Sequence, residues 1–323
     1  MDFEIIARQL VRAVRGRRSQ LALSRRLGYR TNAVYKWEAG RDFPTAATFF
    51  GALARAGIDP IQVVERFAHG RPPWLEEAGP DSPRGVALWL QEQRGGTSIL
   101  ALARRTGFSR FAIGRWLQGD TEPRLHQFLA LFEACSLRLL DLLHAMVDPA
   151  ALPAVRAAWR HLEATRKAAR HAPWTQALLR ASELSAYQAL PQHEPGWMAA
   201  RIGISQEEEE AGLQLLADSG EIMWQREHWQ PTHIAAVDMR SDPASTRAQR
   251  AFWCRQALTR LEAGAPGVFS YNVCGVSERD LKRLRDLHRS YYAEMRAIIA
   301  ASEPVERVVV ANMQLFALDP EAP

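Results

Sequence analysis

Cysteine is scarce in this sequence of 323 residues, which has only Cys135, Cys254 and Cys274. They are far apart, odd in number and outside any CxxC motif, so the pattern predicts neither a disulfide framework nor a zinc site. No uninterrupted apolar stretch approaches the roughly 20 residues of a membrane-spanning helix. The opening MDFEIIARQL also lacks the basic and then apolar layout of a signal peptide. We therefore expect a cytoplasmic protein without a membrane partner.

Sequence motifs of catalysis are also missing. The chain has no GxSxG, no glycine-rich phosphate loop and no HExxH, and no His is paired by sequence with Cys254 or Cys274. His161 and His171 lie ten residues apart without a third metal ligand. We therefore expect no catalytic residues, no metal and no cofactor. An unrecognised enzyme in the C-terminal part is the most distant of the alternatives.

Positive charge is concentrated in the N-terminal part. Residues 1–148 hold 21 Lys and Arg against 15 Asp and Glu, whereas the rest of the chain holds 20 against 21. Within residues 1–70 the count is 12 against 6. A local positive excess favours a polyanion as partner, although a solvated Arg-rich helix face would give the same count.

A duplicated segment occupies this basic part. VYKWEAGRDFP at residues 34–44 is followed 79 residues later by IGRWLQGDTEP at residues 113–123, and Trp, Gly and Pro recur at the same intervals. The same offset aligns Leu23 with Leu102 and Gly28 with Gly107 without a gap. These matches predict two copies of a unit of about 60 residues, joined by the Pro-rich and Gly-rich residues 69–84.

Each copy has the pattern of two short helices joined by a tight turn. In the first copy, Ser19 is a good N-cap and Gly28 a good C-cap for one helix. The next helix stops at Gly40 and buries Val34 and Trp37, which are three residues apart. Its outward positions are then Thr31, Asn32, Tyr35 and Lys36. A short exposed helix with small polar and basic side chains suits the major groove of DNA.

The motif SQLALSRRLGYRTNAVYKWEAGRDFP resembles the lambda-repressor-like (Xre-type) helix-turn-helix domain. The resemblance implies that Gln20 binds a phosphate or a base edge. It places four side chains toward the groove: Thr31, Asn32, Tyr35 and Lys36. It places three arginines near the DNA backbone: Arg18, Arg30 and Arg41. Phosphate contacts position such a domain and base contacts select the sequence.

The second copy departs from this family pattern. Ile99 stands where the first copy has Gln20, and Leu117 replaces Glu38. Phe111 and Gly114 take the outward positions of the first copy. The DNA contacts that we expect from this copy are Ser109, Arg110, Phe111 and Arg115. Two alternatives stay open for the second copy: it reads DNA more weakly than the first, or it serves only as a packing or dimerising module.

The C-terminal half has three parts. Residues 149–190 predict helices, with an interruption at Pro173, and residues 191–238 resemble a winged helix with two short strands around QREH. The second helix of that module opens with four glutamates, which would repel phosphate, so we expect it to bind protein or only its neighbours. Residues 239–323 alternate helix and strand, with strands at 267–277 and 306–318. This half resembles the uncharacterised C-terminal domain of a family of bacterial helix-turn-helix regulators.

Together these features predict a mainly α fold with five parts. They are a first Xre-type domain at 1–70, a second, divergent one at 82–148, a helical linker at 149–190, a winged-helix module at 191–238 and a small α+β domain at 239–323. The predicted function is transcriptional regulation by sequence-specific binding of double-stranded DNA. We expect a homodimer held by the C-terminal half, where a protein or small-ligand effector stays open. The alternative is a protein-interaction adaptor whose helix-turn-helix units no longer read DNA.

Overall fold

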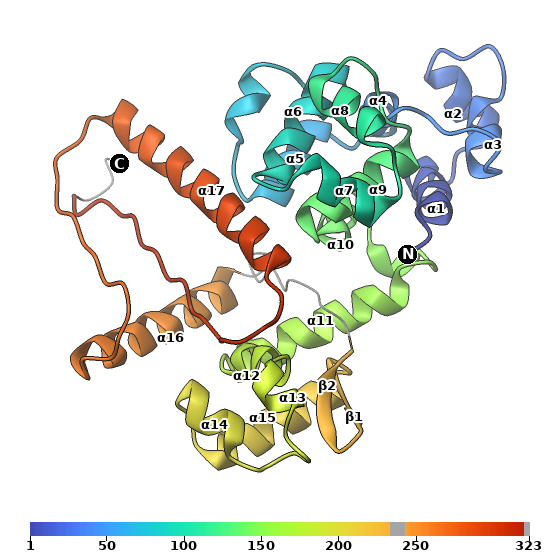
Figure 1. The fold of residues 1–323 in the computed structure, drawn as a ribbon. Coiled ribbons are helices and arrows are strands. Elements are labelled where there is room, and N and C mark those ends of the chain that lie inside the picture. The colour runs from blue at the N-terminus through green and yellow to red at the C-terminus, as the bar shows by residue number, and fades with distance from the viewer. Residues whose placement is uncertain (233–242, 320–323) are drawn as a thin grey trace. The chain divides into compact units, whose positions relative to one another are not determined.

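The computed structural model describes residues 1–232 and 243–319, and the chain divides into two compact units, residues 1–160 and 161–323. The fold is mainly helical, as the sequence predicts (Figure 1). Among the described residues, no helix is long and apolar enough to cross a membrane.

The first unit repeats one five-helix arrangement twice. Its elements are α1 (Phe3–Arg15), α2 (Gln20–Arg26), α3 (Ala33–Glu38), α4 (Ala46–Ala56), α5 (Pro60–Ala68), the 3-10 helix η1 (Pro73–Glu76), α6 (Pro83–Arg94), α7 (Ile99–Thr106), α8 (Arg110–Gln118), α9 (Leu125–Ser136), α10 (Leu139–Met146) and the 3-10 helix η2 (Pro149–Ala151). Adding 79 to the first residues of α2, α4 and α5 gives the first residues of α7, α9 and α10. The duplication in the sequence is therefore a duplication of structure.

The two copies share one continuous apolar core. Trp89 of α6 is fully buried and lies against Phe67 from the first copy and Phe132 from the second, with ring centroids 6.0 and 5.3 Å away. Phe50 and Phe128 meet at 5.6 Å, again across the two copies. Because the apolar faces of both copies are buried against each other, neither copy forms a closed core alone.

The copies are joined by reciprocal contacts that follow the same offset. The Ala46 amide donates to the Pro123 carbonyl at 3.0 Å, and the Leu125 amide donates to the Pro44 carbonyl at 2.8 Å. Ala46 and Leu125 are equivalent positions of the two copies, and so are Pro44 and Pro123, so the two hydrogen bonds are equivalent. Helices obey the same rule: α1 packs on α9 as α6 packs on α4, and α5 packs on α10. Such an exchange is the signature of an approximate two-fold axis.

The second unit starts within α11 (Arg156–His171). It continues with α12 (Thr175–Ser182), α13 (Ser185–Gln188), α14 (Trp197–Ile202), α15 (Gln206–Asp218), β1 (Ile222–Gln225), β2 (His228–Pro231), α16 (Pro243–Glu262) and α17 (Glu278–Ala301). The two strands are antiparallel, with Gln225 opposite His228 and Ile222 opposite Pro231. The predicted hairpin around QREH is thus confirmed, and its two turn residues have positive φ, as tight hairpin turns require.

A small core joins α12 to the winged-helix segment. Leu178 of α12 and Tyr187 of α13 are fully buried with Met198 of α14, Leu213 of α15 and Ile222 of β1. The helical linker that the sequence predicts at 149–190 includes α12, which packs on both α14 and α15. Part of the expected module, residues 233–238, lies outside the described residues.

The strands expected at 267–277 and 306–318 are not formed, and the only sheet of the described residues is the β1 and β2 pair. A strand is stable only with a paired backbone and a buried face. Val268 and Tyr271 are instead 97% and 89% exposed. The apolar alternation that suggested strands is real, but it meets no partner edge among residues 1–232 and 243–319. The predicted helices in the same region, α16 and α17, are confirmed, and the Ser277 hydroxyl caps α17 by accepting from the Asp280 amide.

Candidate nucleic-acid interface

The first candidate reading element is the pair α2 and α3. The Ser19 hydroxyl caps α2 by accepting from the Ala22 amide at 3.1 Å, and Gly28 turns the chain with a φ of 86°. Val34 and Trp37 are buried, with 0% and 4% exposure, as their spacing predicted. This burial leaves the other side of α3 toward solvent.

Three of the four side chains that we expected to face the groove are exposed, namely Thr31, Tyr35 and Lys36. The three arginines expected near the DNA backbone, Arg18, Arg30 and Arg41, are also exposed. The Arg41 guanidinium lies over the Tyr35 ring, 5.4 Å from its centroid, so the cation is held beside α3. This surface offers hydroxyl, ammonium and guanidinium donors from one short segment.

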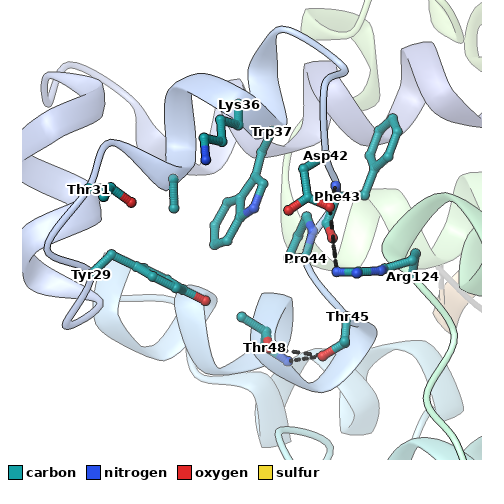
Figure 2. Close-up of a pocket in the computed structure, with 11 residues that line it drawn as sticks. Tyr29, Thr31, Lys36, Trp37, Asp42, Phe43, Pro44, Thr45, Thr48 and Arg124 are labelled. Carbon is teal, nitrogen blue, oxygen red and sulfur yellow. Dashed lines mark hydrogen bonds and ion pairs between the residues drawn. The ribbon is translucent and has the colours of Figure 1, made fainter.

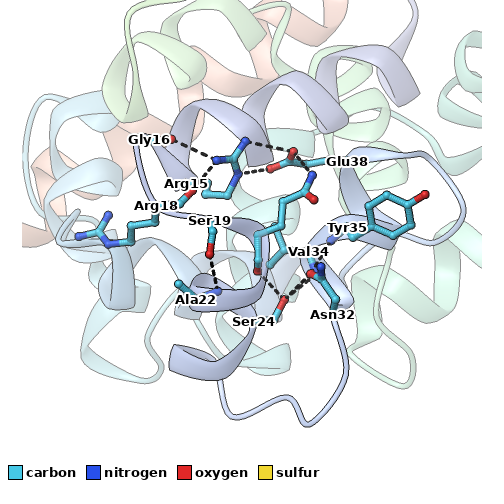
Figure 3. A network of polar contacts seen from close by, with 11 residues as sticks. Arg15, Gly16, Arg18, Ser19, Ala22, Ser24, Asn32, Val34, Tyr35 and Glu38 are labelled. Carbon is cyan, nitrogen blue, oxygen red and sulfur yellow. Dashed lines mark hydrogen bonds and ion pairs between the residues drawn. The ribbon is translucent and has the colours of Figure 1, made fainter.

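Gln20 has a partner that the sequence analysis missed. Its side-chain amide donates to Glu38 Oε2 at 2.6 Å, and Arg15 binds the same carboxylate through Nε at 2.5 Å and Nη2 at 3.2 Å (Figure 3). The side chains of Arg15 and Glu38 are only 16% and 10% exposed. The network ties the C-terminal end of α1 to the start of α2 and the end of α3. The sequence does contain a sign of this network: the second copy has apolar residues at the positions of both Gln20 and Glu38.

Asn32 is the N-cap of α3. Its Oδ1 accepts from the Tyr35 amide at 3.2 Å and lies 3.1 Å from the hydroxyl oxygen of Ser24, which is fully buried (Figure 3). The same Ser24 oxygen accepts from the Val34 amide at 3.0 Å. Asn32 is therefore half-buried and holds the turn between α2 and α3. Its amide oxygen serves the fold, whatever its amide nitrogen contacts.

The second copy presents a different surface. The Ser109 hydroxyl caps α8 by accepting from the Ala112 amide at 3.1 Å, and α8 consequently starts two residues earlier, relative to the repeat, than α3 does. Ile113 and Trp116 are buried. Phe111 is 80% exposed, and Arg110 and Arg115 are exposed beside it. This face combines one large apolar side chain with two cations.

The polar network of the first copy has no counterpart in the second. At its equivalent place lies a hollow of about 280 Å³ lined by Arg94, Ile99, Gly114 and Leu117, among others. Arg94 occupies the position of Arg15, but Leu117 stands where Glu38 accepts its ion pair. Within residues 1–160, the place of the polar network in the first copy is thus taken in the second by a hollow of mixed lining, with Gln91, Arg94 and Gln118 beside Ile99 and Leu117.

We call the pair of reciprocal hydrogen bonds donated by Ala46 and Leu125 the joint of the two copies. A second hollow of about 320 Å³ lies between α3 and this joint (Figure 2). Thr31 and Lys36 line it from the first copy, and Arg124 lines it from the second. Arg124 donates through Nη1 to the Phe43 carbonyl at 2.7 Å and lies 3.6 Å from an oxygen of Asp42. The candidate reading helix is therefore next to the approximate two-fold axis.

His126 also lies at the joint, with its ring centroid 4.3 Å from that of Phe43. Burial lowers the pKa of His126 below its ordinary value, the carboxylate of Glu4 partly opposes this, and the charge of Arg124 adds to it. Protonation of His126 is therefore less favourable in the folded protein than in the unfolded chain.

Two of the four glutamates that open α15 have structural roles. Glu208 and Ser205 form a capping box, with Ser205 Oγ accepting from the Glu208 amide at 3.1 Å. Glu209 is fully buried, and its carboxylate accepts from the amides of Gly196 and Ala199 at the start of α14. The first turn of α15 is thus acidic because it caps two helices.

The fold is that of a mainly helical protein with a duplicated five-helix arrangement, followed by a helical unit that contains one β-hairpin. Residues 155–318 match the family described as "Domain of unknown function (DUF4423)", and the chain belongs to this family. No curated protein and no solved structure matches the chain. The family match starts after both copies of the repeat, so their resemblance to Xre-type domains stays a prediction.

Proposed function

We propose that this protein is a transcriptional regulator that binds double-stranded DNA in a sequence-specific manner, with α3 in the major groove. The observation that carries the proposal is the pairing of two capped helix-turn-helix copies about an approximate two-fold axis, each with its second helix exposed. Dimeric readers of duplex DNA place two such helices about a two-fold axis.

The charge of the two copies supports the same function. Their Lys and Arg exceed Asp and Glu by six over residues 1–148. Arg30 and Arg41 are exposed on the segments that flank α3, and Arg18 is exposed just before α2. Cations in such positions neutralise phosphates and release counterions. The proposed function also implies a cytoplasmic location.

Self-association through the C-terminal half is part of the proposal. Large apolar side chains are exposed along its two extended segments, including Val268, Tyr271, Val273, Phe316 and Leu318, all at least 72% exposed. Contiguous apolar exposure of this kind marks interaction sites. Two chains whose extended segments pair would bury it. A signal, carried by a protein or a small ligand, would act on this half.

The experiment is selection of bound fragments from random duplex DNA with the intact protein, followed by binding measurements across salt concentrations. Affinity should fall by orders of magnitude between about 50 and 200 mM salt if roughly six or more phosphates are contacted. Arg41→Ala and Arg115→Ala should weaken all sequences alike. Arg66→Ala, an exposed arginine on α5, is the charge-matched control. Failure to select any motif, or binding that ignores salt, argues against the proposal.

The adaptor function is the second candidate, and Phe111 favours it. Its 80% exposure, together with the 46% exposure of Leu100 one helix earlier, gives the second copy an apolar surface that suits a protein partner. If Phe111→Ala leaves DNA binding unchanged but abolishes capture of one specific protein, the second copy is an adaptor module.

A further inference from the structure

We infer that one chain reads an asymmetric DNA site, with α3 on one half and α8 on the other. The inference rests on the proposed DNA-binding function and adds the architecture of the target. It replaces two identical half-sites, which a symmetric dimer of single units would read, by two unlike half-sites read within one polypeptide.

The geometry follows from the approximate axis. The axis relates α3 to α8, because α3 packs on α1 as α8 packs on α6. The hollow that contains Thr31, Lys36 and Arg124 places α3 directly beside the joint. The same rotation places α8 beside the joint on the opposite side. Both helices therefore flank the axis, as the reading helices of a two-fold dimer do.

The separation of the two helices is set by a rigid joint. Ala46 and Leu125, which donate the reciprocal hydrogen bonds, are both fully buried, and Phe50 and Phe128 pack across the copies. A joint inside a common core cannot exchange partners as two separate chains can. The spacing between the half-sites should therefore be constant, and the pair α3 and α8 should act at any protein concentration.

The two surfaces differ at every outward position. The repeat aligns Thr31 with Arg110, Asn32 with Phe111, Tyr35 with Gly114 and Lys36 with Arg115. The α3 side offers hydroxyl and amide groups, which select bases by hydrogen bonds. The α8 side offers Phe111, which can contact only an apolar group such as a thymine methyl, and two arginines. The two sides of the joint also differ. Arg124 lies beside α3, and the equivalent residue for the α8 side is Thr45.

The first test uses the motif selected by the full-length protein. We expect two unlike halves at one fixed spacing. Duplexes carrying the α3 half twice or the α8 half twice, as inverted repeats at that spacing, should bind about tenfold or more weakly, since one mismatched base pair alone typically weakens binding by about 5-fold to 150-fold.

The second test makes the two surfaces alike. The variant Arg110→Thr/Phe111→Asn/Gly114→Tyr/Arg115→Lys gives α8 the outward residues of α3, and a Cβ at Gly114 has open space around it. The selected motif should then become a palindrome of the α3 half at the same spacing. The matched control, Thr31→Arg/Tyr35→Gly/Lys36→Arg, keeps the Asn32 cap of α3 and should change only the α3 half. Thermal melting checks that each variant is folded.

The possible outcomes distinguish failure of this inference from failure of the proposed DNA-binding function. A palindromic motif for the unaltered protein, or a single half that the α8 variant does not change, overturns the asymmetric site and leaves DNA binding intact. If no motif is selected from any library, the proposed function itself fails. If the α8 variant melts early, a smaller change, Phe111→Asn alone, must still alter only the α8 half.

Discussion

The side-chain amide of Gln20 donates a hydrogen bond to the carboxylate of Glu38 at 2.6 Å, and the same carboxylate holds Arg15 in a two-point ion pair. Three helices of the first copy thus meet at one half-buried charge. Any substitution here tests folding before it tests recognition.

Glu38→Ala should lower the free energy of unfolding by about 1 to 3 kcal/mol, because Nε and Nη2 of Arg15 and the side-chain amide of Gln20 lose the acceptor that they share. The double variant Arg15→Met/Glu38→Leu should recover much of this loss, since apolar replacement of a buried ion pair is often neutral. Urea denaturation of both variants measures the difference. Equal losses in the two variants would contradict the role of the unpaired arginine.

Asn32 should be tested with a cap-preserving change. Asn32→Ala removes the N-cap of α3 and should cost about 1 kcal/mol, so its effect on DNA binding mixes folding with recognition. Asn32→Ser keeps an N-cap and should leave the melting temperature nearly unchanged. If the Asn32 amide nitrogen reads a base, Asn32→Ser still relaxes the selected motif at one position. An unchanged motif would assign Asn32 to the turn alone.

Trp37→Ala and Trp116→Ala should each cost about 3 to 5 kcal/mol, because both rings are buried, with 4% and 7% exposure. Each ring also loses an edge contact, with Tyr29 at 5.5 Å and Phe108 at 5.3 Å. Since the two copies share one core, we expect residues 1–160 to unfold in a single transition. Either variant should lower the midpoint of that transition and should not unfold its own copy alone. Hydrogen exchange resolves the copies, and loss of protection in one copy only would contradict the shared core.

Acid should weaken the joint through His126. Burial lowers its pKa in the folded protein below the ordinary 6.5, so the unfolded chain binds more protons as the pH falls through about 6.5. The contribution of His126 to the free energy of unfolding is complete above this pH. It should decrease as the pH falls toward the pKa of His126 in the folded protein. His126→Gln should flatten the profile measured by denaturation between pH 7 and 5. The remaining slope should come partly from His193, whose pKa burial also lowers. A profile identical to that of the unaltered protein would exclude His126.

Self-association should depend on the extended segments of the C-terminal half. Tyr271→Asp/Phe316→Asp replaces two side chains that are 89% and 72% exposed, so it should leave the fold intact and convert the dimer to a monomer. Sedimentation of the full-length protein at micromolar concentration measures this. Phe111→Asp, an equally exposed change in the first unit, is the control. If only the control dissociates the dimer, the contact lies in the duplicated copies.

The sequence by itself determined the local structure of this protein. Ser19, Gly28 and Ser277 carry cap signals whose physics is confined to a few neighbouring residues, and their helices end or begin where expected. The spacing of Val34 and Trp37 predicted the buried side of α3 for the same reason. The offset of 79 residues predicted the duplication because equal sequences adopt equal helices.

Only the tertiary structure decided how the pieces meet. Nothing local to Pro44 or Pro123 indicates that the two copies exchange hydrogen bonds across an axis, because that pairing depends on the summed burial of both apolar faces. Gln20 was expected to face DNA, yet its partner Glu38 lies 18 residues away. The segments at 267–277 and 306–318 alternate like strands and remain unpaired, because a strand is completed by the backbone of another segment and not by its own residues.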